Sequence, residues 1–158
     1  MRICFAIFCL AAAAAIASAQ AADSRLTPAE VEAIAKVAVH QVGPAALPGA
    51  GPGLNFVTLD NQLLLMVNFG TDALYARAKA QKEMAVGGMT VPMVLFHAAL
   101  PGIGDEAFDS PPGPVQYVIY LRKGTKAASV TTYLEKGTKP RLTMDQLKAI
   151  AKLIAARL

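Results

Sequence analysis

The segment from residue 54 to residue 69 constrains this chain most, because it alternates as two strands whose faces are both apolar. A turn at Asp60-Asn61 separates Leu54–Leu59 from Gln62–Phe69. Pairing Leu59 with Gln62 places four apolar side chains on each face: Leu54, Phe56, Leu65 and Val67 on one, and Val57, Leu59, Leu64 and Met66 on the other. Such a hairpin must be covered twice, by a core on one side and by a helix or a partner on the other. Leu64 and Met66 are therefore candidate partner-binding residues.

Helix signals flank the strands at both ends of the chain. Thr27-Pro28-Ala29-Glu30 is a capping box, and it predicts a first helix that runs from Thr27 to about Gln41. The same device recurs at Thr143–Gln146, where Leu147 and later apolar residues at helical spacing predict a helix to the C-terminus. Between them, Thr71–Lys82 is predicted to be a helix that Thr71 caps.

A short internal repeat in the sequence predicts a second hairpin. Tyr120–Lys126 returns thirteen residues later as Tyr133–Lys139, and each copy ends in a Lys-Gly-Thr-Lys turn. Folding at Gly124-Thr125 pairs Ile119 with Val130. Residues 84–92 are predicted to form a loop and 93–97 a short strand. The order of elements predicts an α/β (α+β) fold, with a single antiparallel sheet on which N-terminal, middle and C-terminal helices pack.

The N-terminus has the pattern of a cleavable signal peptide. An arginine at position 2 precedes an uninterrupted apolar run, and Ala17-Ser18-Ala19 provides a small-x-small cleavage pattern. We expect residues 1–19 to be removed and residues 20–158 to form a single α+β domain in the periplasm. Cleavage also removes Cys4 and Cys9, so the mature chain has no cysteine and no disulfide scaffold.

Composition restricts the partners of this domain. The chain is 54% hydrophobic and 16% charged, which excludes an intrinsically disordered protein. After cleavage, 14 Lys and Arg face 11 Asp and Glu, a net charge of +3. This mild charge argues against nucleic acid as a partner. No later segment is long and apolar enough to predict a stable membrane span.

The loop from Gly102 to Phe108 is the most distinctive in the chain. Asp105, Glu106 and Phe108 are candidate ligand- or partner-contacting residues, because loops carry function disproportionately. The structural alternative is a short helical turn that begins at Asp105-Glu106, with Ala107 and Phe108 docking inward and Gly104 supplying an unusual backbone angle.

Two kinds of chemistry remain as alternatives to simple binding. His97 with Asp105 and Glu106 offers an imidazole and two carboxylates, the ligand types of a small metal-dependent hydrolase, although no metal-binding spacing accompanies them. Met84, Met89 and Met93 offer thioethers for Cu(I), although methionine more often fills gaps in a core. We predict no catalytic residue, no resident metal and no cofactor.

Three short motifs carry a resemblance. Gly102–Ala107, the strand that ends in Arg122-Lys123-Gly124, and Leu142–Leu147 resemble small exported bacterial proteins of unknown function with a G-I/L-G-D-E-A loop and a closing L-T-x-x-Q-L helix. Members of that set often carry cysteines, which the mature chain lacks. Its layout is similar to that of PsbP/Mog1-type α/β proteins. The resemblance implies a sheet with helices and an exported protein, and it implies no catalytic residue.

These observations together predict an exported, periplasmic, non-enzymatic module that binds a protein partner or a small ligand.

Overall fold

A computed structural model describes residues 25–43, 53–111, 116–135 and 139–158. Its helices are α1 (Pro28–Ala35), α2 (Asp72–Ala80) and α3 (Met144–Arg157). Its strands are β1 (Val39–Val42), β2 (Leu54–Thr58), β3 (Leu63–Thr71), β4 (Glu83–Val86), β5 (Met89–Pro92), β6 (Ala98–Ala99), β7 (Glu106–Asp109), β8 (Gln116–Lys123), β9 (Lys126–Glu135) and β10 (Lys139–Pro140). The predicted signal peptide, residues 1–19, lies outside the described residues.

One antiparallel sheet organises the chain, in the order β1-β2-β3-β9-β8-β7-β6, with β10 beside β9. The predicted register of the β8–β9 hairpin is confirmed, and that of the β2–β3 hairpin is confirmed in part. Ile119 lies opposite Val130 in the β8–β9 pair. In the β2–β3 pair Leu54 lies opposite Val67 and the predicted register holds as far as Phe56, after which a bulge shifts it by one residue. The second Lys-Gly-Thr-Lys turn includes residues 136–138, outside the described residues.

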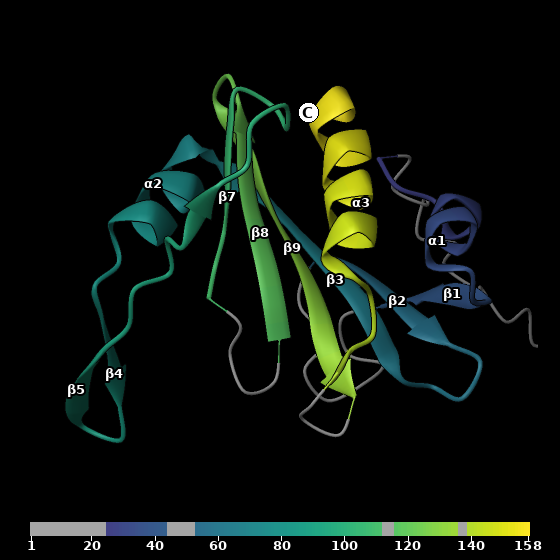
Figure 1. The fold of residues 1–158 in the computed structure, drawn as a ribbon, viewed down its shortest axis with the longest axis horizontal. Coiled ribbons are helices and arrows are strands. Elements are labelled where there is room, and N and C mark those ends of the chain that lie inside the picture. The colour runs from purple at the N-terminus through teal and green to yellow at the C-terminus, as the bar shows by residue number, and fades with distance from the viewer. Residues whose placement is uncertain (1–24, 44–52, 112–115, 136–138) are drawn as a thin grey trace, which may run out of the picture.

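The predicted fold class is confirmed, because helices cover both faces of this sheet (Figure 1). On one face α3 packs on β8 and β9 and buries Leu147, Ile150 and Ile154 in the main core. On the other face α2 packs on β3, β8 and β9, where Tyr75 and Ala78 join a smaller cluster. Successive residues of a strand point to opposite faces, so β8 gives Ile119 to the main core and Tyr120 to the smaller one.

Both predicted capping boxes form, and their residues also join α1 to α3. Gln146, the third residue of α3, donates from Nε2 to the carbonyl oxygens of Ile34 at 3.0 Å and Ala35 at 3.3 Å. These carbonyls lie at the C-terminal end of α1, where no intrahelical donor remains. At the far end of α3, Arg157 forms an ion pair with Glu30 of the first capping box. Polar side chains therefore fix the two helices to each other at both ends.

The first helix is shorter than the sequence predicts. It ends at Ala35, Lys36 adopts a left-handed conformation with φ 62°, and the chain enters β1 at Val39. His40 therefore lies in a strand opposite Val57, and not at a helix end. The Glu32 side chain accepts a hydrogen bond from the Val39 amide at 2.9 Å, which fixes this early change of direction.

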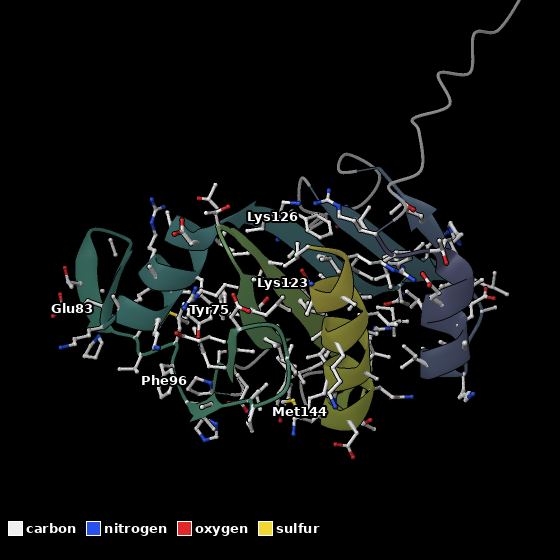
Figure 2. The ribbon with its side chains drawn as sticks, turned by 90° about the horizontal axis from the view of Figure 1, so that it is seen from above. Tyr75, Glu83, Phe96, Lys123, Lys126 and Met144 are labelled. Atoms are coloured by element: carbon white, nitrogen blue, oxygen red, sulfur yellow. The ribbon has the colours of Figure 1, made fainter. Side chains whose placement is uncertain are left out.

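A small hairpin replaces the predicted loop at 84–92. Strands β4 and β5 pair around Gly87 and Gly88, whose φ values of 56° and 83° suit a tight turn that requires positive φ. Seen from above, Glu83 marks this hairpin at the end of the molecule opposite α1 (Figure 2). The predicted strand at 93–97 is absent, and the next strand is β6.

The hairpin of β2 and β3 is buried on both sides, as the double apolar pattern requires. Val57 is 0% exposed and Leu64 is 2% exposed, whereas Leu59, in the turn, is 76% exposed. Within the described ranges, no helix has the length and apolarity needed to cross a membrane.

Candidate functional site

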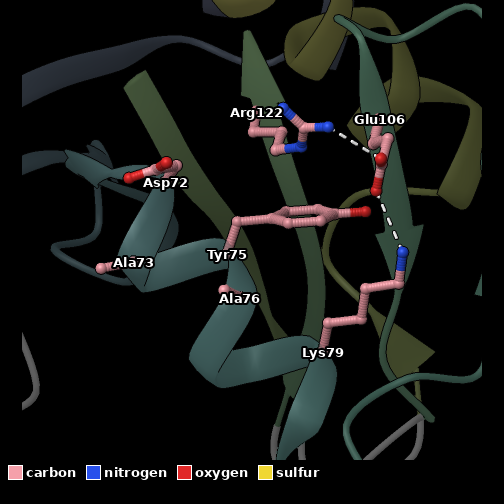
Figure 3. Close-up of a pocket in the computed structure, with 7 residues that line it drawn as sticks. All are labelled: Asp72, Ala73, Tyr75, Ala76, Lys79, Glu106 and Arg122. Carbon is pink, nitrogen blue, oxygen red and sulfur yellow. Dashed lines mark hydrogen bonds and ion pairs between the residues drawn. The ribbon is translucent and has the colours of Figure 1, made fainter. Parts of the chain in front are cut away.

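An open groove lies between α2 and the adjoining strands β7 and β8 (Figure 3). Its volume is about 460 Å³, and its lining residues are Asp72, Ala73, Tyr75, Ala76, Lys79, Glu106 and Arg122. We call it the α2–β7 groove. Two acidic and two basic side chains line this groove.

The local structure explains why these residues meet. Tyr75 and Lys79 are four residues apart on α2, so their side chains lie on the same side of the helix. Glu106 is the first residue of β7 and lies directly opposite Arg122 of β8. Directly opposed residues of paired strands point to the same face of a sheet, so both reach toward α2.

Glu106 is the centre of an ion-pair network in the groove. Its Oε2 lies 3.0 Å from Lys79 Nζ, and its Oε1 accepts a hydrogen bond from Arg122 Nη2 at 2.8 Å. The Tyr75 hydroxyl points toward the same carboxylate (Figure 3). Hydrogen bonds from Arg122 and Lys79 lower the pKa of Glu106 from 4.5 to about 2, so this side chain is an anion at neutral pH.

Tyr75 forms the apolar floor between the two cations. Its ring lies between Arg122 and Lys79, with the guanidinium carbon 5.9 Å and Lys79 Nζ 5.7 Å from the ring centroid (Figure 3). Burial, followed by the hydrogen bond to Glu106, raises the pKa of Tyr75 to about 12, so its hydroxyl keeps its proton.

Phe108 supports this floor from below. Its ring contacts Tyr75 edge-on at a centroid distance of 5.2 Å, stacks on Tyr120 at 5.1 Å, and lies 5.3 Å from Phe96. Phe108 itself is fully buried. Aromatic contacts of this kind hold α2 on the sheet and fix the position of Tyr75.

The loop before β7 is held tightly against β8. Asp105 donates its amide to the Arg122 carbonyl at 2.9 Å, and its Oδ2 accepts from the Gly124 amide at 2.7 Å. Gly104 has φ 61°, which confirms the unusual backbone angle predicted for it. The predicted helical turn at Asp105-Glu106 does not form, because Glu106 begins a strand that pairs with β8.

The candidate residues from the sequence fall into two groups. Glu106 lines the groove, Phe108 lies beneath it, and Asp105 holds the loop beside it. Leu64 is buried in the main core, and Met66 lies on β3, where its sulfur accepts a hydrogen bond from the Tyr133 hydroxyl at 3.9 Å. The structure therefore does not bring Leu64 and Met66 to the groove.

His97 pairs with a carboxylate that the sequence did not single out. Its Nδ1 lies 3.2 Å from Asp109 Oδ1, while Glu106 is engaged with Lys79 and Arg122 and Asp105 with Gly124. Among the described residues, no group of three His, Cys, Asp or Glu side chains is placed to hold a metal ion.

The methionines proposed for copper lie mainly on the small hairpin. Met89 follows its turn and is 68% exposed, Met93 is half-buried beyond β5, and the Met84 side chain lies outside the described ones.

Sequence reasoning missed Tyr75, Lys79 and Arg122. The first two had a usable signal, since an aromatic and a cation at i and i+4 share one side of a helix. For Arg122, the only signal in the sequence was its place at the end of a predicted strand. Its partner could not be predicted, because it depends on how β7 aligns with β8.

The network predicts a particular response to acid. The pKa of Glu106 is lower in the folded chain than its ordinary 4.5, so its contribution to stability is complete above about pH 4.5 and is lost as the pH falls toward 2. We expect the thermal midpoint of the Glu106→Gln variant to fall less steeply over this window than that of the wild type. The pKa of Glu30 is also lowered to about 2, so Glu30 makes the thermal midpoint depend on pH in both proteins.

Thermal unfolding followed by circular dichroism at each half pH unit measures this difference. Glu83→Gln is the control, because Glu83 is exposed and has no ion-pair partner in the described residues. Equal slopes for the Glu106→Gln variant and the wild type would contradict the assigned network.

The fold and the groove define a small α+β protein with an open, charged, aromatic-floored groove on one face of its sheet. No protein-family model matches the chain, and neither a curated protein nor a solved structure matches it.

Proposed function

We propose that this chain is an exported, periplasmic, non-enzymatic binding module that holds a small ligand or a segment of a partner protein in the α2–β7 groove. The observation that carries the proposal is the contrast between rim and floor. The side chains of Lys79, Glu106 and Arg122 are 49%, 40% and 31% exposed, whereas Tyr75 beneath them is 4% exposed. Binding sites typically combine an apolar surface with a few placed polar groups in this way.

The shape of α2 also supports binding at this place. Ala73 and Ala76, three residues apart, leave space on the helix where larger side chains would fill the groove. Both alanines are exposed, so neither is needed for the core. The groove can therefore be filled by substitution without disturbing the fold.

Native mass spectrometry of the protein purified from its own host tests the proposal. We expect the wild type to carry a bound mass, and Ala76→Phe to lose it because the new ring occupies the groove. Ala80→Phe is the matched control, since Ala80 is exposed on the same helix and does not line the groove. A bare wild-type chain, or a mass that Ala76→Phe retains, would contradict binding in the groove.

A further inference from the structure

We infer that the α2–β7 groove takes a zwitterion with a free ammonium and a free carboxylate, such as a short unblocked peptide. This inference rests on the proposed function and names the chemical class of its ligand. It is based on three features of the groove: the charge of its lining, the hydrogen-bond donors and acceptors that remain available in it, and its aromatic floor.

The charges of the lining cancel. Asp72 and Glu106 are acidic, and Lys79 and Arg122 are basic. A groove with two charges of each sign favours neither simple anions nor simple cations over the other. It does favour a ligand that presents both signs and carries no net charge.

The carboxylate of such a ligand finds donors on the two cations. Glu106 occupies one nitrogen of Arg122 and the ammonium of Lys79, and among the described residues neither cation has a second hydrogen-bonded side-chain partner, although both lie near the Tyr75 ring. A guanidinium has five N–H donors and an ammonium has three, so most of these donors remain available. Arg122 and Lys79 can thus bind a second carboxylate beside Glu106.

The ammonium of the ligand finds a separate acceptor. Asp72 is exposed in the first turn of α2, and its carboxylate has no side-chain partner in the part of the chain that the structure describes. Glu106 is the weaker acceptor for a ligand ammonium, because its charge is already paired with Lys79 and Arg122. Between these charged groups, the exposed Ala76 offers apolar contact to the body of the ligand, and the buried Tyr75 ring supports it from beneath. A groove of about 460 Å³ lies within the range of small-molecule sites.

Titration calorimetry with three matched probes tests the inference on the full mature chain. The probes are Ala-Ala, its N-acetyl derivative, which lacks the ammonium, and its C-terminal amide, which lacks the carboxylate. We expect Ala-Ala to bind at least tenfold more tightly than either blocked probe, because each loses one charged contact. Equal binding of Ala-Ala and one blocked probe would overturn the inference, and so would no binding of any probe.

Two variants assign the ends of the ligand. Asp72→Asn is expected to weaken Ala-Ala at least fivefold and leave N-acetyl-Ala-Ala unchanged, whereas Lys79→Gln is expected to weaken Ala-Ala and leave the amide unchanged. An equal effect of Asp72→Asn on both Ala-Ala and the N-acetyl probe would overturn the assignment of the ammonium. The failures are distinguishable: if a natural bound mass disappears in Ala76→Phe but Ala-Ala does not bind, the proposed function stands and the zwitterion does not.

Discussion

Replacing Gly104 with alanine is expected to lower the free energy of unfolding by about 2 to 5 kcal/mol. Two costs add at this position. Its φ of 61° is a left-handed conformation that costs an alanine about 1 to 2 kcal/mol. A Cβ there would also lie 2.4 Å from the Arg122 carbonyl oxygen, and relieving such a clash costs about 1 to 3 kcal/mol.

Gly102 provides a matched control for this prediction. It lies in the same loop with φ 78°, but a Cβ built on it meets nothing within 4 Å. Gly102→Ala should therefore lower the free energy of unfolding only by the backbone cost of about 1 to 2 kcal/mol. Urea denaturation of both variants measures the difference, and equal losses would mean that β8 does not approach Gly104 as closely as the structure has it.

Replacing Phe108 with alanine is expected to cost about 3 to 5 kcal/mol and to loosen α2 from the sheet. Phe108 is fully buried and contacts the rings of Tyr75, Tyr120 and Phe96. Its removal leaves a cavity directly under the floor of the groove. The backbone amides of α2 should then exchange with deuterium faster under native conditions, while those of α3 on the opposite face should change less.

Two further substitutions make this prediction specific. Phe96→Ala removes the same ring from a residue that is 37% exposed, so it should cost clearly less than Phe108→Ala. Ile154→Ala removes a fully buried side chain from α3 and should cost about 2 to 5 kcal/mol while increasing exchange mainly in α3. A Phe108→Ala loss no larger than that of Phe96→Ala would contradict the role of Phe108 beneath α2.

Local signals in the sequence were sufficient where they agreed with the surrounding fold. The two capping boxes begin α1 and α3, because each is complete within four residues. The β8–β9 register follows from the turn at Gly124 and the alternation of its flanks. Local signals failed where the structure depends on contacts between residues that are distant in sequence, or where a turn signal in the sequence was not interpreted as a turn. Gly87-Gly88 between apolar flanks is itself a hairpin signal, and reading residues 84–92 as a loop overlooked it.

The class of fold follows from local patterns along the chain. Strands that are apolar on both faces require cover on both, and α3 and α2 pack on opposite faces of the sheet. The groove, in contrast, depends on packing between segments that lie far apart in the chain. Glu106 meets Arg122 because β7 aligns with β8, and it meets Lys79 across 27 residues of chain because α2 lies on that face. Side-chain periodicity is a property of neighbours in sequence, whereas an ion pair depends on a register and a packing that no single segment specifies.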